Sequence, residues 1–210
     1  MSTHLTAVDR ILDAAATVFA DQGFGGARVD EIAHRAGVNK AMLYYRVGDK
    51  EALYTAVLTR NFATARRNLE AALATADSAT ERLTAIIGAI VRTARAIPNH
   101  PQIMLREVAS GGAGLSPVVI AAMAELLGLV RGVLEEGVRE GVFRPIDPLL
   151  THLLVLGTVV FMTATEPLRE RMCEAGVPVR TTATPEQFAA FLADVVQHGI
   201  ATPSRDGGTP

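Results

Sequence analysis

A short segment near the amino terminus combines side chains that can bond nucleic-acid bases. Residues 29–46 read VDEIAHRAGVNKAMLYYR. Lys40 could donate to guanine O6 or N7, and Asn39 or Tyr44 could contact base edges. Met42 could lie against a thymine methyl or pack on the sugar-phosphate rim. These residues are the candidates for reading bases.

A second set of side chains around this segment suits phosphate rather than bases. Its candidates are Arg28, Tyr45, Arg46 and Lys50, with Lys50 at the start of a following helix whose amides favour an anion. Between residues 24 and 50 there are five basic and three acidic residues, although the whole chain has a net charge of −2. Without further context the lysines read as ordinary solvated residues, and the adjacent tyrosines as half-buried core aromatics.

The elements that must position these groups follow helix-turn-helix logic. Ile32, Ala33 and Ala36 form one apolar stripe, and Gly37 ends that helix where a left-handed turn residue costs least. Leu43 faces back inward from the next helix, which leaves a polar outer face. The spacing predicts a second helix presented to a groove of DNA.

The rest of the chain reads as helix, because alternation typical of strands is nearly absent. Capping boxes are expected at Thr6, Ser78 and Thr184, and N-cap residues precede prolines at Ser116 and Asp147. The expected helices span 6–22, 29–36, 39–46, 49–76, 79–97, 99–110, 117–140, 148–172 and 185–199, with a bend or break at Glu166-Pro167. The sequence therefore predicts an all-α protein of about nine helices.

Residues from about 11 to 58 resemble the DNA-binding region of the TetR family of bacterial transcriptional regulators. The matching features are Ile11-Leu-Asp-Ala-Ala, Phe19-Ala, Gly23-Phe24, Asp30-Glu-Ile-Ala33, Ala36-Gly-Val38, Lys40, Leu43-Tyr-Tyr45 and Lys50-Glu-Ala-Leu53. The resemblance implies a ligand-responsive regulator of repressor type. Such a regulator would bind a palindromic double-stranded DNA operator as a homodimer and be released by a small hydrophobic or amphipathic effector.

The expected organisation follows from that resemblance. Residues 1–58 would form a three-helix DNA-binding head, joined by a connecting helix to a ligand-binding and dimerisation domain over 59–202. Residues 203–210 would form a disordered tail. A looser similarity over residues 105–148 points to AcrR-like regulators and names no ligand.

The sequence departs from the family pattern in two places, at residues 46–47 and at residues 27–28. Val47 replaces the usual aromatic, with Arg46 adding a cation before it. Ala27 and Arg28 replace the usual Thr or Ser, so the cap of the second helix through residue 27 is lost and Arg28 is expected to take over the phosphate contact.

Two later helices, 117–140 and 148–172, are apolar on most of their faces. A helix that is apolar all round is buried, and a monomer of this size could not cover both. They are therefore expected to be covered by a second copy, and the resemblance to the TetR family implies a four-helix interface between the two copies. The interface candidates are Leu126, Leu127, Val130, Leu154, Val155 and Val159.

An effector pocket is expected in the same part of the chain, because pockets are usually apolar with a few orienting polar groups. The candidates for its lining are Met104, Met123, Phe143, His152, Phe161 and Met162. Each also has a plainer interpretation: His152 as a bonded core histidine, Phe161 and Met162 as core or interface. Arg106 and Glu107 could orient a ligand or form a simple surface pair.

Composition narrows the alternatives. The single cysteine, Cys173, excludes an intramolecular disulfide framework and a cysteine-rich zinc site, and no metal or cofactor is expected. The longest apolar stretch, 153–165, is too short to span a membrane, and no secretory signal is evident, so we expect a cytoplasmic protein without a membrane partner. An enzyme is not expected, since no catalytic constellation is present. The alternative is a helical interaction module or a ligand-independent regulator with weakened DNA binding, and a salt-dependent shift on promoter DNA would discriminate against the interaction module.

Overall fold

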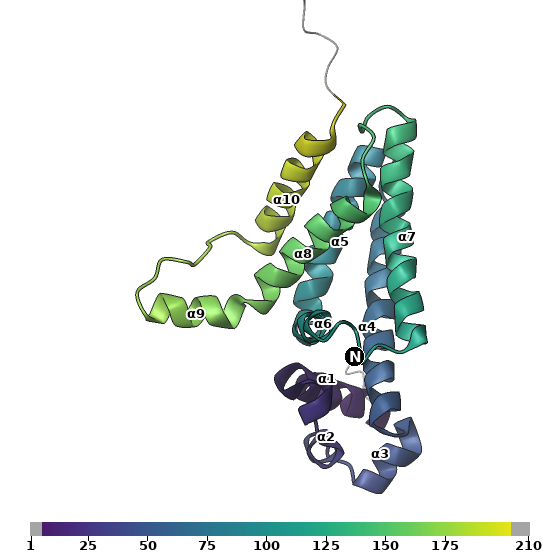
Figure 1. The fold of residues 1–210 in the computed structure, drawn as a ribbon, viewed down its shortest axis with the longest axis vertical. Helices are drawn as coiled ribbons and strands as arrows, with labels where there is room; N and C mark the ends of the chain where they lie inside the picture. The colour runs from purple at the N-terminus through teal and green to yellow at the C-terminus, as the bar shows by residue number, and fades with distance from the viewer. Residues whose placement is uncertain (1–5, 203–210) are drawn as a thin grey trace, which may run out of the picture. The chain divides into compact units, whose positions relative to one another are not determined.

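The computed structural model describes residues 6–202, which fold into ten helices without a strand (Figure 1). The expected all-α class is confirmed. The tail 203–210, expected to be disordered, lies outside the described residues. The helices are α1 (Ala7–Gly26), α2 (Val29–Ala36), α3 (Lys40–Val47), α4 (Lys50–Leu73), α5 (Ala79–Ala96), α6 (Asn99–Ala109), α7 (Pro117–Arg139), α8 (Pro148–Ala164), α9 (Glu166–Glu174) and α10 (Pro185–Ile200).

The tenth helix arises where the sequence predicts a bend. The expected helix 148–172 ends at Ala164, and α9 begins at Glu166 with its axis turned 47° from that of α8. Pro167 lies in the first turn of α9, where its missing N–H costs nothing. The break at Glu166-Pro167 is therefore confirmed.

Local capping follows the predicted pattern. Thr6 with Asp9, and Thr184 with Gln187, form reciprocal capping boxes, and Asp147 accepts from the amides of Leu149 and Leu150. The predicted stop at Gly23 is seen as a kink inside α1, where Gly23 has φ +70° and the chain continues helically to Gly26. The starts of these helices are set by side chains that accept hydrogen bonds from the otherwise unpaired amides of the first turn.

One described helix, α7, is long and apolar enough to span a membrane by length and composition. The expectation based on uninterrupted apolar stretches missed it, because Glu125 and Arg131 interrupt its sequence. Val130, Val133 and Leu134 from α7 are buried in a hydrophobic core. A core helix meets the same length and composition test.

The chain divides into two compact units. The head unit comprises residues 1–64 and 97–123, and the body unit comprises residues 65–96 and 124–210. α6 therefore packs with the amino-terminal helices, most extensively with α1. The expected division at residue 58 stays a prediction about separable domains, while the compact units group the chain differently.

Each unit has its own core. In the head unit, the side chains of Ile11, Phe19, Ile32, Leu43 and Leu53 are fully buried. In the body unit, α5 supplies Leu83, Ile86 and Ile87, which pack with buried residues of α7, α8 and α10. These cores hold α3 on one unit and the apolar faces of α8 and α10 on the other.

Candidate nucleic-acid interface

The turn between α2 and α3 has the geometry that the sequence predicts. Gly37 is left-handed, with φ +66° and ψ +36°, and its amide donates to backbone carbonyls of α2. Asn39 caps α3, because its Oδ1 accepts from the Met42 amide at 2.7 Å. Leu43 is fully buried and anchors α3 to the head core. The orientation of α3 is thus fixed at its start and at its middle.

The outer side of α3 is exposed and rich in hydrogen-bonding groups. Tyr45 is 85% exposed, and Tyr44 and Met42 are 44% and 40% exposed. Tyr45 follows Leu43 by two residues, which places it about 200° around the helix, on the side away from the core. The alternative in which both tyrosines are half-buried core aromatics is therefore wrong.

Lys40 is not free in this arrangement. Its Nζ lies 2.9 Å from Asp30 Oδ1 and 3.1 Å from Asp30 Oδ2, across the turn between α2 and α3. The hydrogen bond and the charge of Asp30 raise the pKa of Lys40. The first cation of α3 is therefore held by a carboxylate of the preceding helix.

The four predicted phosphate contacts come from the N-cap of α2, from α3 and from the start of α4. Arg28 is exposed at the N-cap of α2 without a side-chain cap bond, while Ala27 is buried. The Arg46 guanidinium lies 5.8 Å from the centre of the Tyr45 ring. The cap through residue 27 is absent, as the sequence predicts.

Lys50 has a structural partner besides any ligand. Its Nζ donates to the Gly25 carbonyl at 3.3 Å and lies 4.7 Å from the centre of the Phe24 ring. An ammonium has three donors, so this bond leaves two of them for an anion. The first turn of α4 is thereby tied to the end of α1.

Sequence reasoning missed the polar contacts through which α6 holds the head unit. Arg106 Nε and Nη2 donate to the carbonyls of Ala20 and Asp21 at 3.0 and 2.8 Å. Asn99 donates to Thr17 Oγ1 at 3.2 Å. Arg106 therefore bonds the backbone near the end of α1 instead of forming the simple surface pair with Glu107.

Glu107 is the buried partner of the same helix. It is 5% exposed, accepts from Tyr54 Oη at 2.6 Å through Oε1, and accepts from the Gly114 amide at 3.1 Å through Oε2. A Cβ at Gly114 would come within 2.7 Å of Oε1, so only glycine permits this approach. Burial and the Glu107 carboxylate both raise the pKa of Tyr54, which stays protonated and donating.

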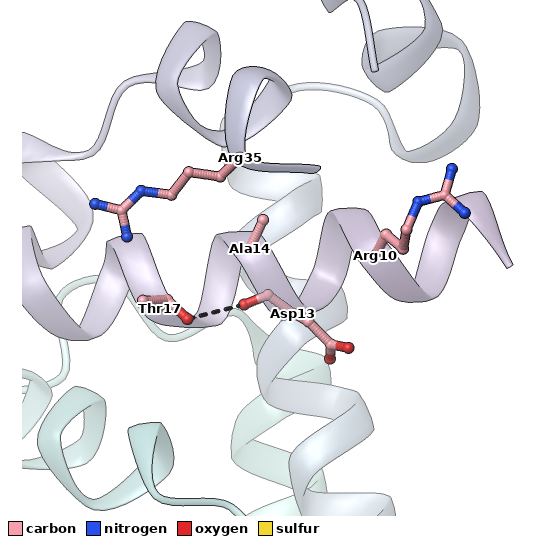
Figure 2. A pocket seen from close by; sticks show the side chains of 5 residues that line it. All are labelled: Arg10, Asp13, Ala14, Thr17 and Arg35. Carbon is pink, nitrogen blue, oxygen red and sulfur yellow. Dashed lines mark hydrogen bonds between the residues drawn. The ribbon is translucent and has the colours of Figure 1, made fainter. Parts of the chain in front are cut away.

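A crevice in the head unit is lined by side chains that are already engaged. Its volume is about 360 Å³, and its lining comprises Arg10, Asp13, Ala14, Thr17 and Arg35 (Figure 2). Arg35 bonds Glu31 at 2.8 Å, Asp13 bonds Arg60 at 2.8 Å, and Thr17 donates to the Asp13 carbonyl. Figure 2 shows Arg10 and Arg35 pointing away from each other, so their guanidinium groups do not converge on one anion.

The predicted pocket residues are divided between the two compact units, and their common cavity stays a prediction. Met104 and Met123 belong to the head unit, while Phe143 is buried in the body core beneath Gly137. Phe161 is 65% exposed, and Met162 is partly exposed. Of the six predicted residues, His152 shows the feature that calls for a ligand: its buried Nδ1 has no hydrogen-bond partner within the described part of the chain.

The predicted interface residues separate into two groups. Val130, Val155 and Val159 lie inside the chain's own core, whereas Leu126 and Leu127 are partly exposed and Leu154 is 53% exposed. Val118 and Ile120 at the start of α7 are more than half exposed, and further large exposed apolar side chains lie on α8 and on α10. They are Leu149, Leu150, Leu153, Leu154 and Phe161 on α8, and Phe191 and Val195 on α10.

The two helices share a depression at one end of this surface. A cavity of about 470 Å³ is lined by the loop before α8, by the start of α8 and by the end of α10. Leu150, Leu154 and Val195 belong to this lining. Leu150, Leu154 and Val195 therefore bring exposed apolar side chains of α8 and α10 together in the body unit.

A glycine turn, a capped recognition helix and an exposed face of donors define a helix-turn-helix DNA-binding regulator. Residues 11–57 match the bacterial regulatory proteins of the tetR family, and residues 76–164 match the tetracyclin repressor-like C-terminal domain. The chain is 34% identical over 154 residues to the HTH-type transcriptional repressor NicS of Pseudomonas putida, with 70% of each chain covered. The chain belongs to the TetR family of transcriptional regulators.

Solved structures show the same fold. The TetR family regulator PfmR from Thermus thermophilus is 26% identical with a TM-score of 0.71, covering 90% of this chain and 98% of that one. The regulator FadR from Bacillus subtilis, solved in complex with stearoyl-CoA, is 19% identical with a TM-score of 0.73, covering 91% and 98%. The resemblance implied by the sequence is confirmed at the level of family and fold.

Proposed function

We propose that this TetR-family regulator is a cytoplasmic repressor that binds a palindromic operator as a homodimer and releases it when a small hydrophobic or amphipathic effector binds. The observation that carries the proposal is the exposed face of α3, held by the Gly37 turn and the buried Leu43. The similarity to the repressor NicS supports repression rather than activation.

The proposed DNA contacts follow the exposure of the head. Lys40, Tyr44, Met42 and the amide nitrogen of Asn39 face the bases from the first turns of α3. Arg28, Tyr45, Arg46 and Lys50 hold phosphates on either side. Tyr45, at 85% exposed, can also reach a base.

The proposed homodimer uses α8 and α10 rather than α8 and α7. The apolar surface of α8 and α10 contains leucine, phenylalanine and valine side chains that are about half exposed or more in one chain. Exposed apolar patches of this kind mark interaction sites. A second copy supplies an identical surface, and a two-fold axis through it makes the contact self-complementary.

The proposed effector lies against His152. Burial lowers the pKa of His152, so the ring is neutral near pH 7 and can bond a ligand through its unpartnered Nδ1. The long acyl group of the FadR ligand supports an apolar effector class for this fold. Because α6 packs in the head unit, an effector that shifts α6 would alter the elements that orient α3.

The DNA-binding proposal is tested with a duplex selected from a random pool by the purified protein. Lys40→Ala should lower affinity for the selected duplex by about 1–3 kcal/mol and relax the preference at one base pair per half-site. Fluorescence anisotropy across base variants and salt concentrations measures both effects. A protein that selects no duplex, or shows no salt dependence, favours the interaction module without DNA binding.

The dimer is tested with two equally exposed leucines. Leu154→Asp should shift the sedimenting species from dimer to monomer, because an unpaired carboxylate would be buried against the partner. Leu168→Asp on α9 is the matched control, since Leu168 is 55% exposed and lies outside the surface of α8 and α10. A wild-type monomer at micromolar concentration contradicts the homodimer and the palindromic operator together.

A further inference from the structure

The ion pair between Asp30 and Lys40 joins the two helices of the helix-turn-helix. Both carboxylate oxygens lie within hydrogen-bond distance of the ammonium, at 2.9 and 3.1 Å. The side chains are 71% and 49% exposed, so the pair faces solvent rather than the core. Exposed ion pairs contribute little to folding. Its main consequence must therefore be sought in what the exposed face of α3 does.

The pair places a negative charge among the proposed DNA contacts. Asp30 follows Arg28 by two residues, and Lys40 is the first residue of α3. A carboxylate at this position repels phosphates, and its two contacts occupy two of the three donors of an ammonium that would otherwise bind any phosphate within reach. Glu31, the next acid of α2, bonds Arg35 at 2.8 Å and accepts from Gln22 at 2.8 Å instead.

We propose that Asp30 is a specificity-determining positioning residue, which restrains Lys40 from phosphates of arbitrary sequence and holds its ammonium in the orientation that meets one operator base. The proposal rests on the DNA-binding function proposed above. Lys40 stays charged throughout, because the neighbouring carboxylate raises its pKa. Asp30 thus lowers the affinity for DNA in general and raises the preference for the operator over other sequences, as repulsive elements do in other specific interfaces.

The pair has a clear consequence for unrelated DNA. When Asp30 loses its charge, Lys40 gains access to a phosphate in each head, and one repulsive charge disappears. Affinity for a scrambled duplex should rise several-fold, with the log–log salt slope steepening by about 0.9 per protomer. Affinity for the operator should change less, because Lys40 there is already committed to a base.

The experiment compares Asp30→Asn, Asp30→Glu and Glu31→Gln in the full chain. Each protein is titrated against the duplex selected by the wild type and against a scrambled duplex of the same composition, at several salt concentrations. Glu31→Gln is the matched control, because it removes the same charge one residue away without touching Lys40. Asp30→Glu keeps the carboxylate and should retain most of the wild-type discrimination. Thermal unfolding verifies that all variants are folded.

The expected result is a ratio of operator to scrambled affinity that is lower by about 3- to 10-fold in Asp30→Asn, corresponding to ~0.7–1.4 kcal/mol, and an unchanged ratio in Glu31→Gln. Adding Lys40→Ala to both Asp30→Asn and Glu31→Gln should remove the difference between these two charge-neutralising variants, because Asp30 acts through Lys40. Equal shifts of both duplexes by Asp30→Asn and Glu31→Gln would overturn the proposal, since Asp30 would then act only through net charge. Failure of the wild type to bind any selected duplex would instead overturn the DNA-binding function itself.

Discussion

The head unit and the body unit bury different chemistry. Among the described residues, the buried polar side chains of the head include an amide and a carboxylate, Asn61 and Glu107, whereas those of the body include the hydroxyls of Thr93 and Thr151 but no carboxylate. The body core is otherwise a continuous apolar cluster drawn from α5, α7, α8 and α10. A carboxylate specifies its partners by direction, while apolar contacts are specified by volume.

This difference fits the tasks that the two units would have. In the head, α6 is joined to α1 and α4 by bonds with defined donors and acceptors, namely Arg106 to Ala20 and Glu107 to Tyr54. Such bonds fix the orientation of helices that must present side chains to DNA. The body needs a core that tolerates rearrangement around an effector. The two units should therefore respond differently to removal of one buried group.

The largest effect is expected in the body, from loss of volume. Ile87→Ala should lower the free energy of unfolding by about 2–5 kcal/mol, because Ile87 is fully buried and the truncation leaves a cavity. Urea unfolding followed by circular dichroism measures the change. Ile90→Ala on the same helix is the control, since Ile90 is only partly buried and should cost less. Equal losses at both positions would contradict the placement of α5 in the core.

A smaller effect with a different signature is expected in the head. Glu107→Gln keeps the side-chain shape but replaces two charged acceptors by one neutral acceptor and one amide donor, so the charge-assisted bonds to Tyr54 and the Gly114 amide are lost or weakened, at a cost of about 1–3 kcal/mol. A double-mutant cycle with Tyr54→Phe should give a coupling above the additivity error of about 0.5 kcal/mol. Strict additivity would show that the Tyr54–Glu107 bond is absent in solution.

The smallest effect is a pH dependence confined to the head. Burial lowers the pKa of His100 to about 4, and its ring packs edge-on against Phe62 with Nδ1 3.4 Å from Asn61. In the unfolded chain the His100 ring takes up a proton near pH 6.5, whereas in the folded head it stays neutral down to about pH 4. The contribution of the neutral ring to the free energy of unfolding is therefore fully present above about pH 6.5 and is lost as the pH falls towards 4.

Between about pH 6.5 and 5 this difference should destabilise the protein by about 1.5 kcal/mol. His100→Gln should flatten the stability profile in that interval, as measured by urea unfolding at fixed salt. His198→Gln, at an exposed position on α10, provides the control. A profile of the His100 variant that parallels the wild type would show that the ring is not buried neutral.

The head was predictable because its information is local. Gly37, Asn39 and Leu43 lie within seven residues, and their backbone and burial requirements are readable from residue type. Even so, the sequence does not reveal the pairing of Lys40 with Asp30, because the side-chain geometry depends on how α2 crosses α3. The α6 contacts were out of reach, since Tyr54 and Glu107 are 53 residues apart.

The apolar helices of the body show where composition misleads. The helix 117–140 looks like an interface helix because most of its residues are apolar, but Val130 and its neighbours fill the chain's own core. α10 looks like an ordinary amphipathic helix, although Phe191 and Val195 remain exposed on it. A residue buried by a neighbouring helix and a residue buried by a second copy are both apolar in the sequence. The fold is needed to tell which of the two covers a given residue.

The continuity of α4 bears on how such regulators can be recombined. This helix runs unbroken from Lys50 to Leu73, and the boundary between the compact units falls inside it, after Thr64 (Figure 1). A chimera that exchanges only residues 1–58 would place Tyr54 against a foreign α6. Residues 1–64 should instead be transplanted together with residues 97–123. The unit to exchange is therefore encoded by two separate stretches of the gene.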